Sequence, residues 1–152
     1  PQNEWPSVAV GDWHIVGHYV HDNSEPNTAP EGSETSQLPY GGGILLLGVD
    51  RVDVQRNSIE NNDFFGMGMI DYCIAVDVTE FDCITNPPAF KDTSPDSNKF
   101  IGNLLVNNGA NPPPGPFETS AADFLALGGK NNCARDNTYA TSTLLATLTK
   151  CP

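Results

Sequence analysis

The chain has 152 residues, the length of one domain, and only 17% of them are charged, whereas Gly (14) and Pro (13) are abundant. This composition disfavours a helical bundle and favours a β-protein with many turns. The formal net charge of −12, with the few bases scattered singly, excludes nucleic acid as an expected partner, and no apolar run has the length of a membrane-spanning helix.

The chain begins with a short segment, 1–12, that we expect to be a lead-in to the fold. It carries neither an initiator Met nor a signal peptide, so we expect a processed product. The segment is too short and too rich in proline to form a helical cap.

From Trp13 onward, one type of segment recurs and ends each time in an Asn-rich turn. Its copies begin at Trp13, Val52 and Asn98, with a weaker copy at Cys133. Two columns of this internal alignment are informative, one of them apolar and one polar. The apolar column holds Ile15, Val54, Phe100 and Ala134, and the polar column holds His18, Asn57, Asn103 and Asn137.

A second type of segment alternates with the first and begins at Gly43, Gly66 and Asp123. The spacing between copies varies only where turn-rich insertions lie, at 22–40, 74–97 and 109–122. A fixed short period interrupted by loops is typical of a solenoid. We therefore predict an all-β solenoid of about three to four turns with long loop insertions. A β-sandwich is the alternative, but it does not require an Asn at one recurring corner.

The recurring asparagines Asn57, Asn103 and Asn137 predict a structural ladder. In stacked turns, each amide side chain can bond to the same corner of the next turn.

These repeats resemble the right-handed parallel β-helix proteins of the pectate-lyase-like superfamily, in particular the C-terminal portion of a secreted bacterial member. The resemblance covers the chain from Trp13 to Pro152. It implies β-helix repeats over 13–143 and an open first turn that a preceding segment or a partner covers. The motifs of the polygalacturonase-like enzymes and of the alginate epimerases are not found in this sequence.

The only histidines, His14, His18 and His21, lie close together and are weak candidates for a metal site. A corner hydrogen bond is the simpler role for His18. We expect no cofactor, although acidic turns such as that of Asp50 and Asp53 are compatible with Ca²⁺.

Aromatic and acidic residues beside the strand that starts at Gly66 are the first candidates for a binding surface. Phe64, Phe65, Asp71 and Tyr72 are expected to lie at the surface, where aromatic rings stack on sugars. Ordinary packing in the core is the alternative role of such aromatics.

The four cysteines show no zinc-type spacing and are expected to form two local disulfides, Cys73–Cys83 and Cys133–Cys151, as in extracellular proteins. The second disulfide would fix a C-terminal cap, 144–152, over the last turn.

Three functions remain open. The first is a non-catalytic extracellular module that packs on another chain, or on a second copy, through its open N-terminal turn. The second is a carbohydrate-binding module, and the third is a fragment of a polysaccharide lyase or glycoside hydrolase. We expect the first, because no catalytic motif is recognised and the strand edges of an open turn invite pairing.

Overall fold

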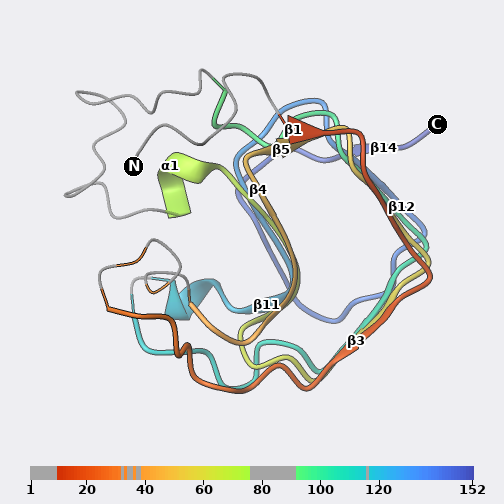
Figure 1. The fold of residues 1–152 in the computed structure, drawn as a ribbon. Helices are drawn as coiled ribbons and strands as arrows, with labels where there is room; N and C mark the ends of the chain where they lie inside the picture. Colours follow the sequence, from red (N-terminus) through yellow and green to blue (C-terminus); the bar gives the residue numbers. More distant parts are fainter. Residues whose placement is uncertain (1–9, 32, 34–35, 37–38, 76–91, 116) are drawn as a thin grey trace.

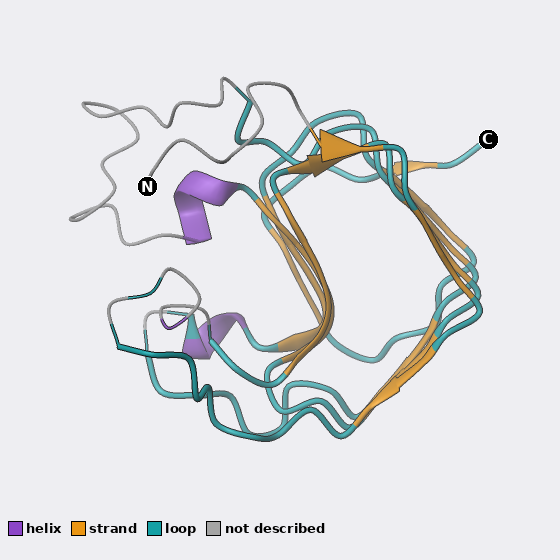
Figure 2. Cartoon of the chain, viewed as in Figure 1, coloured by secondary structure: helices purple, strands orange, loops and turns teal. Residues whose placement is uncertain are grey.

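The structure is a computed structural model that describes residues 10–31, 33, 36, 39–75, 92–115 and 117–152. These residues form mostly short β-strands, and the helices among them are the one-turn α1 (Tyr72–Ala75) and the 3-10 helix η2 (Glu118–Ser120) (Figure 2). The prediction of an all-β protein is confirmed.

The strands form four sheets, which we name A to D, and all paired strands run parallel. Sheet A consists of β1 (Val10–Gly11) and β5 (Val49–Asp50), and sheet B of β2 (His14–Val16), β6 (Asp53–Gln55), β9 (Lys99–Ile101), β12 (Cys133–Arg135) and β14 (Thr149–Lys150). Sheet C consists of β3 (Tyr19–His21), β7 (Ser58–Glu60) and β10 (Leu104–Val106). Sheet D consists of β4 (Gly42–Leu47), β8 (Phe65–Ile70), β11 (Ala122–Leu127) and β13 (Ser142–Leu144).

Successive passes of the chain follow the same path, one above the other (Figure 1). We call each pass a circuit: the first spans 10–47, the second 49–70, the third 95–127 and the fourth 130–144. The apolar column that the sequence predicts is a row of Cα partners in sheet B, in which Ile15 pairs with Val54, Val54 with Phe100, and Phe100 with Ala134.

The hydrophobic core runs through the middle of the stack. Alternate residues of each strand point inward, as the period of two in a β-strand requires. In sheet D, Ile44, Met67 and Phe124 are partners in one buried row. Phe100 of sheet B is fully buried and packs against the Phe124 ring, with a centroid distance of 5.2 Å. Burying one such side chain is worth about 1.5–3 kcal/mol, so the stacked rows hold the circuits together.

A ladder of asparagines lies at the corner between sheets B and C. Asn57 Nδ2 donates to Asn103 Oδ1 at 2.9 Å, and Asn103 Nδ2 donates to Asn137 Oδ1 at 2.8 Å. The backbone N–H of His18 donates to Asn57 Oδ1, so His18 joins the column through its backbone. The residue before this column has a positive φ in every circuit, and glycine occupies two of these four sites. They are Gly17, Arg56, Gly102 and Asp136.

Two further ladders mark other corners. Between sheets A and B, the backbone N–H of Asn98 donates to Asn132 Oδ1 at 2.7 Å. Between sheets C and D, amide side chains bond from Asn62 to Asn108, and Asn108 bonds to the buried carboxylate of Asp123. These polar groups are buried, but each is paired with the circuit next to it, which removes the cost of burying them.

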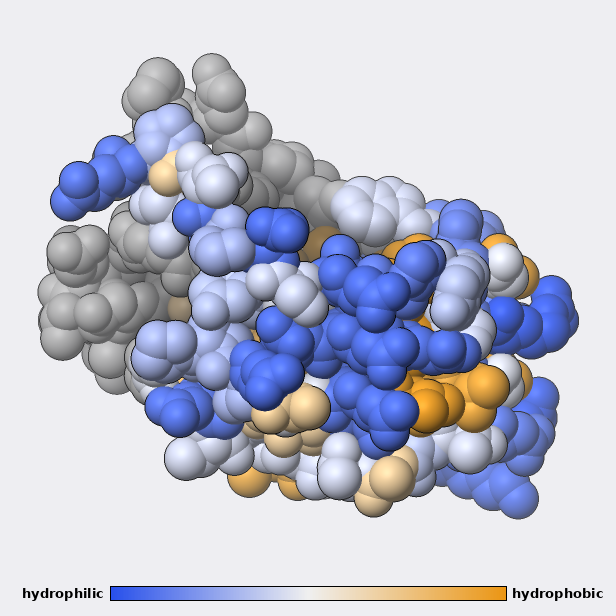
Figure 3. Space-filling view, turned by 90° about the horizontal axis from the view of Figure 1, so that it is seen from below, coloured by the Kyte–Doolittle hydropathy of each residue, from blue (hydrophilic) through white to orange (hydrophobic). Residues whose placement is uncertain are grey.

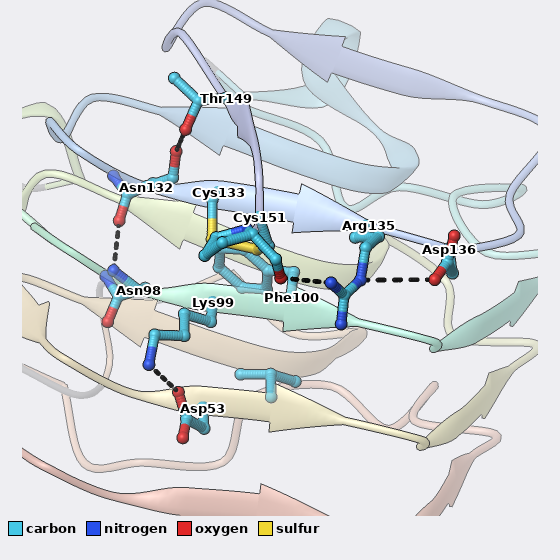
Figure 4. Close-up of a disulfide and its surroundings, with 12 residues drawn as sticks. Asp53, Asn98, Lys99, Phe100, Asn132, Cys133, Arg135, Asp136, Thr149 and Cys151 are labelled. Carbon is cyan, nitrogen blue, oxygen red and sulfur yellow. Dashed lines mark hydrogen bonds and ion pairs between the residues drawn. A yellow bond between two sulfur atoms is a disulfide. The ribbon is translucent and has the colours of Figure 1, made fainter.

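The C-terminal segment covers the end of the fourth circuit. Ala146 and Leu148 pack against the core, and the N–H groups of Leu145 and Ala146 both donate to the carbonyl of Ala126. The predicted disulfide Cys133–Cys151 is present and joins the segment that follows β14 to β12 (Figure 4).

Candidate functional site

The first circuit has an open strand edge within the described part of the chain, since β1 to β4 are each the last strand of their sheet. In sheet B, Asp53 N–H donates to the carbonyl of Trp13, and Gly17 N–H donates to the carbonyl of Gln55. Parallel strands use alternate residues for each neighbour. The backbone groups of His14 and Val16 therefore point away from β6, toward the open edge.

Sheet C repeats this arrangement. The carbonyl of His18 accepts from Ser58 N–H, and Asp22 N–H donates to the carbonyl of Glu60. The intervening residues, Tyr19 and His21, therefore direct their backbone groups toward the open edge.

Large apolar side chains are exposed along the same circuit. Trp13 is 49% exposed and Tyr19 60% exposed, and Val16 and Leu45 are also exposed. The unpaired edge is therefore accompanied by apolar surface, which is the combination that another strand or chain can cover.

Polar side chains line the outer faces of sheets B and C. Asp53 lies between two cationic or titratable partners, with Oδ2 3.3 Å from His14 Nδ1 and Oδ1 3.5 Å from Lys99 Nζ. Tyr19 donates its hydroxyl to Glu60 Oε2 at 3.3 Å. Partial loss of hydration at the hydroxyl, followed by the nearby Glu60 carboxylate, raises the pKa of Tyr19 above its ordinary value, although the side chain is mostly exposed. Figure 3 shows the lower side of the view in Figure 1, where hydrophilic residues cover much of the surface and a hydrophobic patch lies among them.

An exposed ion pair links the first circuit to the second. Arg51 donates from Nε and Nη2 to the two carboxylate oxygens of Asp12, at 2.8 and 2.9 Å. The hydrogen bond from Arg51 is the largest cause that lowers the pKa of Asp12. Because both groups are exposed, the pair adds little to stability but fixes the orientation of both side chains.

A hollow of about 320 Å³ opens beside the first circuit, between the end of β3 and the start of β4. One wall is formed by 22–25 and the other by 39–42, with Leu45 and Phe65 at the base. Asp22, Glu25 and Tyr40 are among its lining residues, so acidic and apolar residues both contribute to the hollow.

The first part of the chain is uniformly acidic. Residues 1–50 hold seven of the 19 acidic residues and none of the seven Lys and Arg residues. This stretch of sequence therefore carries a net negative charge, part of which Arg51 of the second circuit offsets through its ion pair with Asp12.

Two of the four predicted surface residues are not at the surface. Phe64 and Phe65 are 1% and 2% exposed and pack edge-to-face with a centroid distance of 5.0 Å. The expectation that they stack on a ligand at the surface is wrong, because Phe117 and Ala121 of the loop before β11 pack against the same cluster. Phe65 contributes only to the base of the hollow.

Asp71 and Tyr72 lie at the start of α1 and are half-buried. Asp71 Oδ1 accepts the backbone N–H of Cys73 at 2.8 Å, which is a helix N-cap bond. Its other oxygen, Oδ2, accepts the Thr93 hydroxyl. These contacts give Asp71 a structural role. Tyr72 N–H donates to the carbonyl of Thr93.

The three histidines do not meet. His14 lies in β2 near Asp53, His18 lies at the corner, and His21 Nδ1 contacts Asp22 Oδ2 at 2.8 Å. Among the described residues, no group of three or more His, Cys, Asp or Glu side chains is placed to hold a metal ion.

One predicted disulfide partner lies outside the described part of the chain. Cys83 lies outside the described residues, so the pairing of Cys73 with Cys83 stays a prediction. No helix in the described ranges is long and apolar enough to cross a membrane.

The hollow and the two additional ladders were not predicted from the sequence. The hollow is built from loops without a repeat, so no internal alignment indicates it. The ladder through Asn62 and Asn108 had a signal, since both residues close their recurring segments.

Asp123 ends this ladder. Burial alone would raise its pKa, but hydrogen bonds from Asn108, Ala140 and Thr141 outweigh burial and lower it. Asp50 shows the opposite balance, because burial raises its pKa despite the hydrogen bond from the Asp96 N–H.

No protein-family model matches the chain, and no curated protein or solved structure is significantly similar to it.

Proposed function

We propose that the chain is a right-handed parallel β-helix module of the pectate-lyase-like type. Its role is structural, and it packs on another chain through the strand edges of its first circuit. The parallel sheets, the partner rows of sheet B and the corner ladders support the β-helix. The Cys133–Cys151 disulfide is compatible with an extracellular location.

The open edge of β2 and β3 carries this proposal. Backbone N–H and C=O groups of His14, Val16, Tyr19 and His21 point away from the second circuit, beside the exposed side chains of Trp13 and Tyr19. An added strand gains its affinity from such main-chain groups and its specificity from the neighbouring side chains. At the other end of the stack, Ala146 and Leu148 pack against the core, and the N–H groups of Leu145 and Ala146 are bonded to the carbonyl of Ala126, so part of that end is covered.

A strand peptide with the sequence of residues 52–60 tests the proposal, because β6 and β7 pair in parallel with the covered side of β2 and β3, and a second copy of this segment would offer the same two strands and corner to the open side. The labelled peptide is titrated into the whole chain and its fluorescence anisotropy is measured. Val16→Pro removes an N–H from the open edge and leaves the ladder to β6 intact. Val16→Thr keeps that N–H and serves as the matched control.

We expect wild type and Val16→Thr to bind the peptide, and Val16→Pro to bind it at least about fivefold more weakly, since one lost hydrogen bond is worth about 1 kcal/mol. Equal binding to all three proteins, or no binding to wild type, would refute edge pairing.

A carbohydrate-binding role is the second candidate, and it is favoured by the exposure of Trp13 and Tyr19. Flat exposed rings bind sugar faces. Titration with neutral oligosaccharides, followed by tryptophan fluorescence, tests this role, and a lack of any change at millimolar sugar would exclude it.

A further inference from the structure

We infer that the hollow beside the first circuit binds the ammonium group of a primary alkylamine, either a free amine or the side chain of a lysine in an extended segment. The hollow is distinct from the strand edge of the proposed function, and the inference does not depend on that function.

The two walls of the hollow are fixed by the second circuit. On one side, the backbone N–H and Nδ2 of Asn23 both donate to Asn62 Oδ1, at 3.3 and 2.7 Å. On the other, Phe64 N–H donates to the carbonyl of Gly41 at 2.8 Å. Gly41 has a φ of +84°, and a Cβ there would lie 2.9 Å from the Asp63 Cβ. Both walls are therefore hydrogen-bonded to the same corner of the second circuit, at residues 62–64. This makes the hollow a preformed feature.

The base of the hollow is apolar. A Cβ on Gly42 would lie 2.4 Å from Cζ of Phe65, so the absence of a side chain at Gly42 lets the Phe65 ring fill this place. Leu45 is 37% exposed beside it, and Tyr40 adds an aromatic wall. An aliphatic chain, such as the stem of an alkylamine, packs on such a surface while its charged end stays near polar groups.

Two carboxylates supply the charge. Asp22 is oriented by His21, whose Nδ1 lies 2.8 Å from Asp22 Oδ2 and whose ring stacks on Tyr19 with a centroid distance of 4.3 Å. Glu25 lines the same hollow and has no ion-pair partner among the described residues.

The local charge selects the ligand class. The described lining residues include Asp22 and Glu25 and no Lys or Arg, so an anionic ligand would be repelled by these two carboxylates. A cation gains attraction from both carboxylates and from the Tyr40 ring. The volume of about 320 Å³ is at the low end of small-molecule sites and fits one short alkylamine.

The test uses n-butylamine and the neutral 1-butanol, which have the same alkyl chain. Each is titrated into the whole isotope-labelled chain at about pH 8, where an alkylamine is protonated. The signals of the Leu45 methyl groups and the Tyr40 ring report binding. Asp22→Asn and Glu25→Gln each remove one carboxylate of the hollow, and Glu118→Gln, on η2, removes an exposed carboxylate that does not line it.

We expect butylamine to shift both signals and butanol to bind more weakly. Asp22→Asn and Glu25→Gln should each weaken butylamine binding by about two- to fivefold, the effect of one exposed charge pair, whereas Glu118→Gln should not change it. Equal affinities for amine and alcohol, unchanged binding by both hollow variants, or no saturable shift would overturn the inference.

A second pair of probes separates the two sources of the amine. These are an extended peptide with a single lysine and the same peptide with norleucine in its place. Preference for the lysine peptide over butylamine identifies a protein segment as the ligand. Stronger binding of butylamine identifies a free amine. The peptide that tests the open strand edge binds a different surface. The proposed function and the amine site can therefore each be refuted without the other.

Discussion

Truncating the central member of the asparagine ladder, Asn103→Ala, should be strongly destabilising. Asn103 is 1% exposed. Its Oδ1 accepts the backbone N–H and Nδ2 of Asn57, and its Nδ2 donates to the carbonyl of Val54 and to Asn137 Oδ1. The substitution removes all four bonds at once.

The magnitude follows from which partners are left without a bond. Asn57 Nδ2 still donates to the carbonyl of Ile15, and Asn137 Oδ1 still accepts the backbone N–H of Asn103. The Asn57 N–H loses its acceptor, and the carbonyl of Val54 loses the side-chain donor. Leaving the buried Asn57 N–H without an acceptor, together with the other lost side-chain bonds, costs about 2–5 kcal/mol in the free energy of unfolding. For a chain of this size, the expected decrease in melting temperature is about 5–15 °C.

Thermal and urea unfolding of the oxidised protein, followed by circular dichroism, measures this loss. Asn111→Ala is the matched control, because Asn111 is exposed and its side chain makes a single long hydrogen bond, from Nδ2 to Asp63 Oδ1 at 3.4 Å. It should change stability by less than about 0.5 kcal/mol. If Asn103→Ala and Asn111→Ala have the same melting temperature, the ladder does not stabilise the stack and our reasoning is wrong.

Three further substitutions probe other parts of the fold. Asp123 has a lowered pKa, so its stabilising contribution is complete above the unfolded value of 3.8 and is lost as the pH falls through the folded value. Asp123→Asn should therefore lose less stability than wild type between about pH 5 and pH 2. Acid titrations followed by fluorescence measure this difference. Replacing both cysteines in Cys133→Ser/Cys151→Ser should lower the free energy of unfolding by about 3 kcal/mol, since the disulfide spans 18 residues; urea unfolding without reductant checks this, and an unchanged midpoint would contradict it. Gly43→Ala should destabilise by about 1–3 kcal/mol because its Cβ would lie 2.3 Å from the Gly66 carbonyl oxygen; calorimetry measures the change, and a melting temperature equal to that of wild type would show that the backbone yields without cost.

The regular part of the molecule was predictable because its strands obey one register. The apolar column through Val54 and Phe100 is visible in the sequence, and the structure pairs these residues directly. The Cys133–Cys151 disulfide was predictable from its short separation and was confirmed.

The irregular part was not predictable, because it depends on contacts between insertions. Phe64 and Phe65 follow a turn, where an aromatic pair is compatible with either surface or core. Their burial depends on Phe117 and Ala121, which come from an insertion far along the sequence. The hollow likewise forms only where the loops around Asp22 and Tyr40 come together. These loops are not part of the sequence repeat, so the repeat does not predict their contact.

The asparagine ladder acts as a ruler that is independent of loop length. The separation along the chain is 46 residues between Asn57 and Asn103 but 34 between Asn103 and Asn137, yet the two amide contacts measure 2.9 and 2.8 Å. The spacing between neighbouring circuits is thus set by hydrogen bonds at the corners, and the length of chain spent in each circuit has no influence on it. Insertions can therefore grow, shrink or change in sequence while every strand keeps its place, which makes the loops the part of this molecule in which new binding surfaces can arise without remodelling the stack.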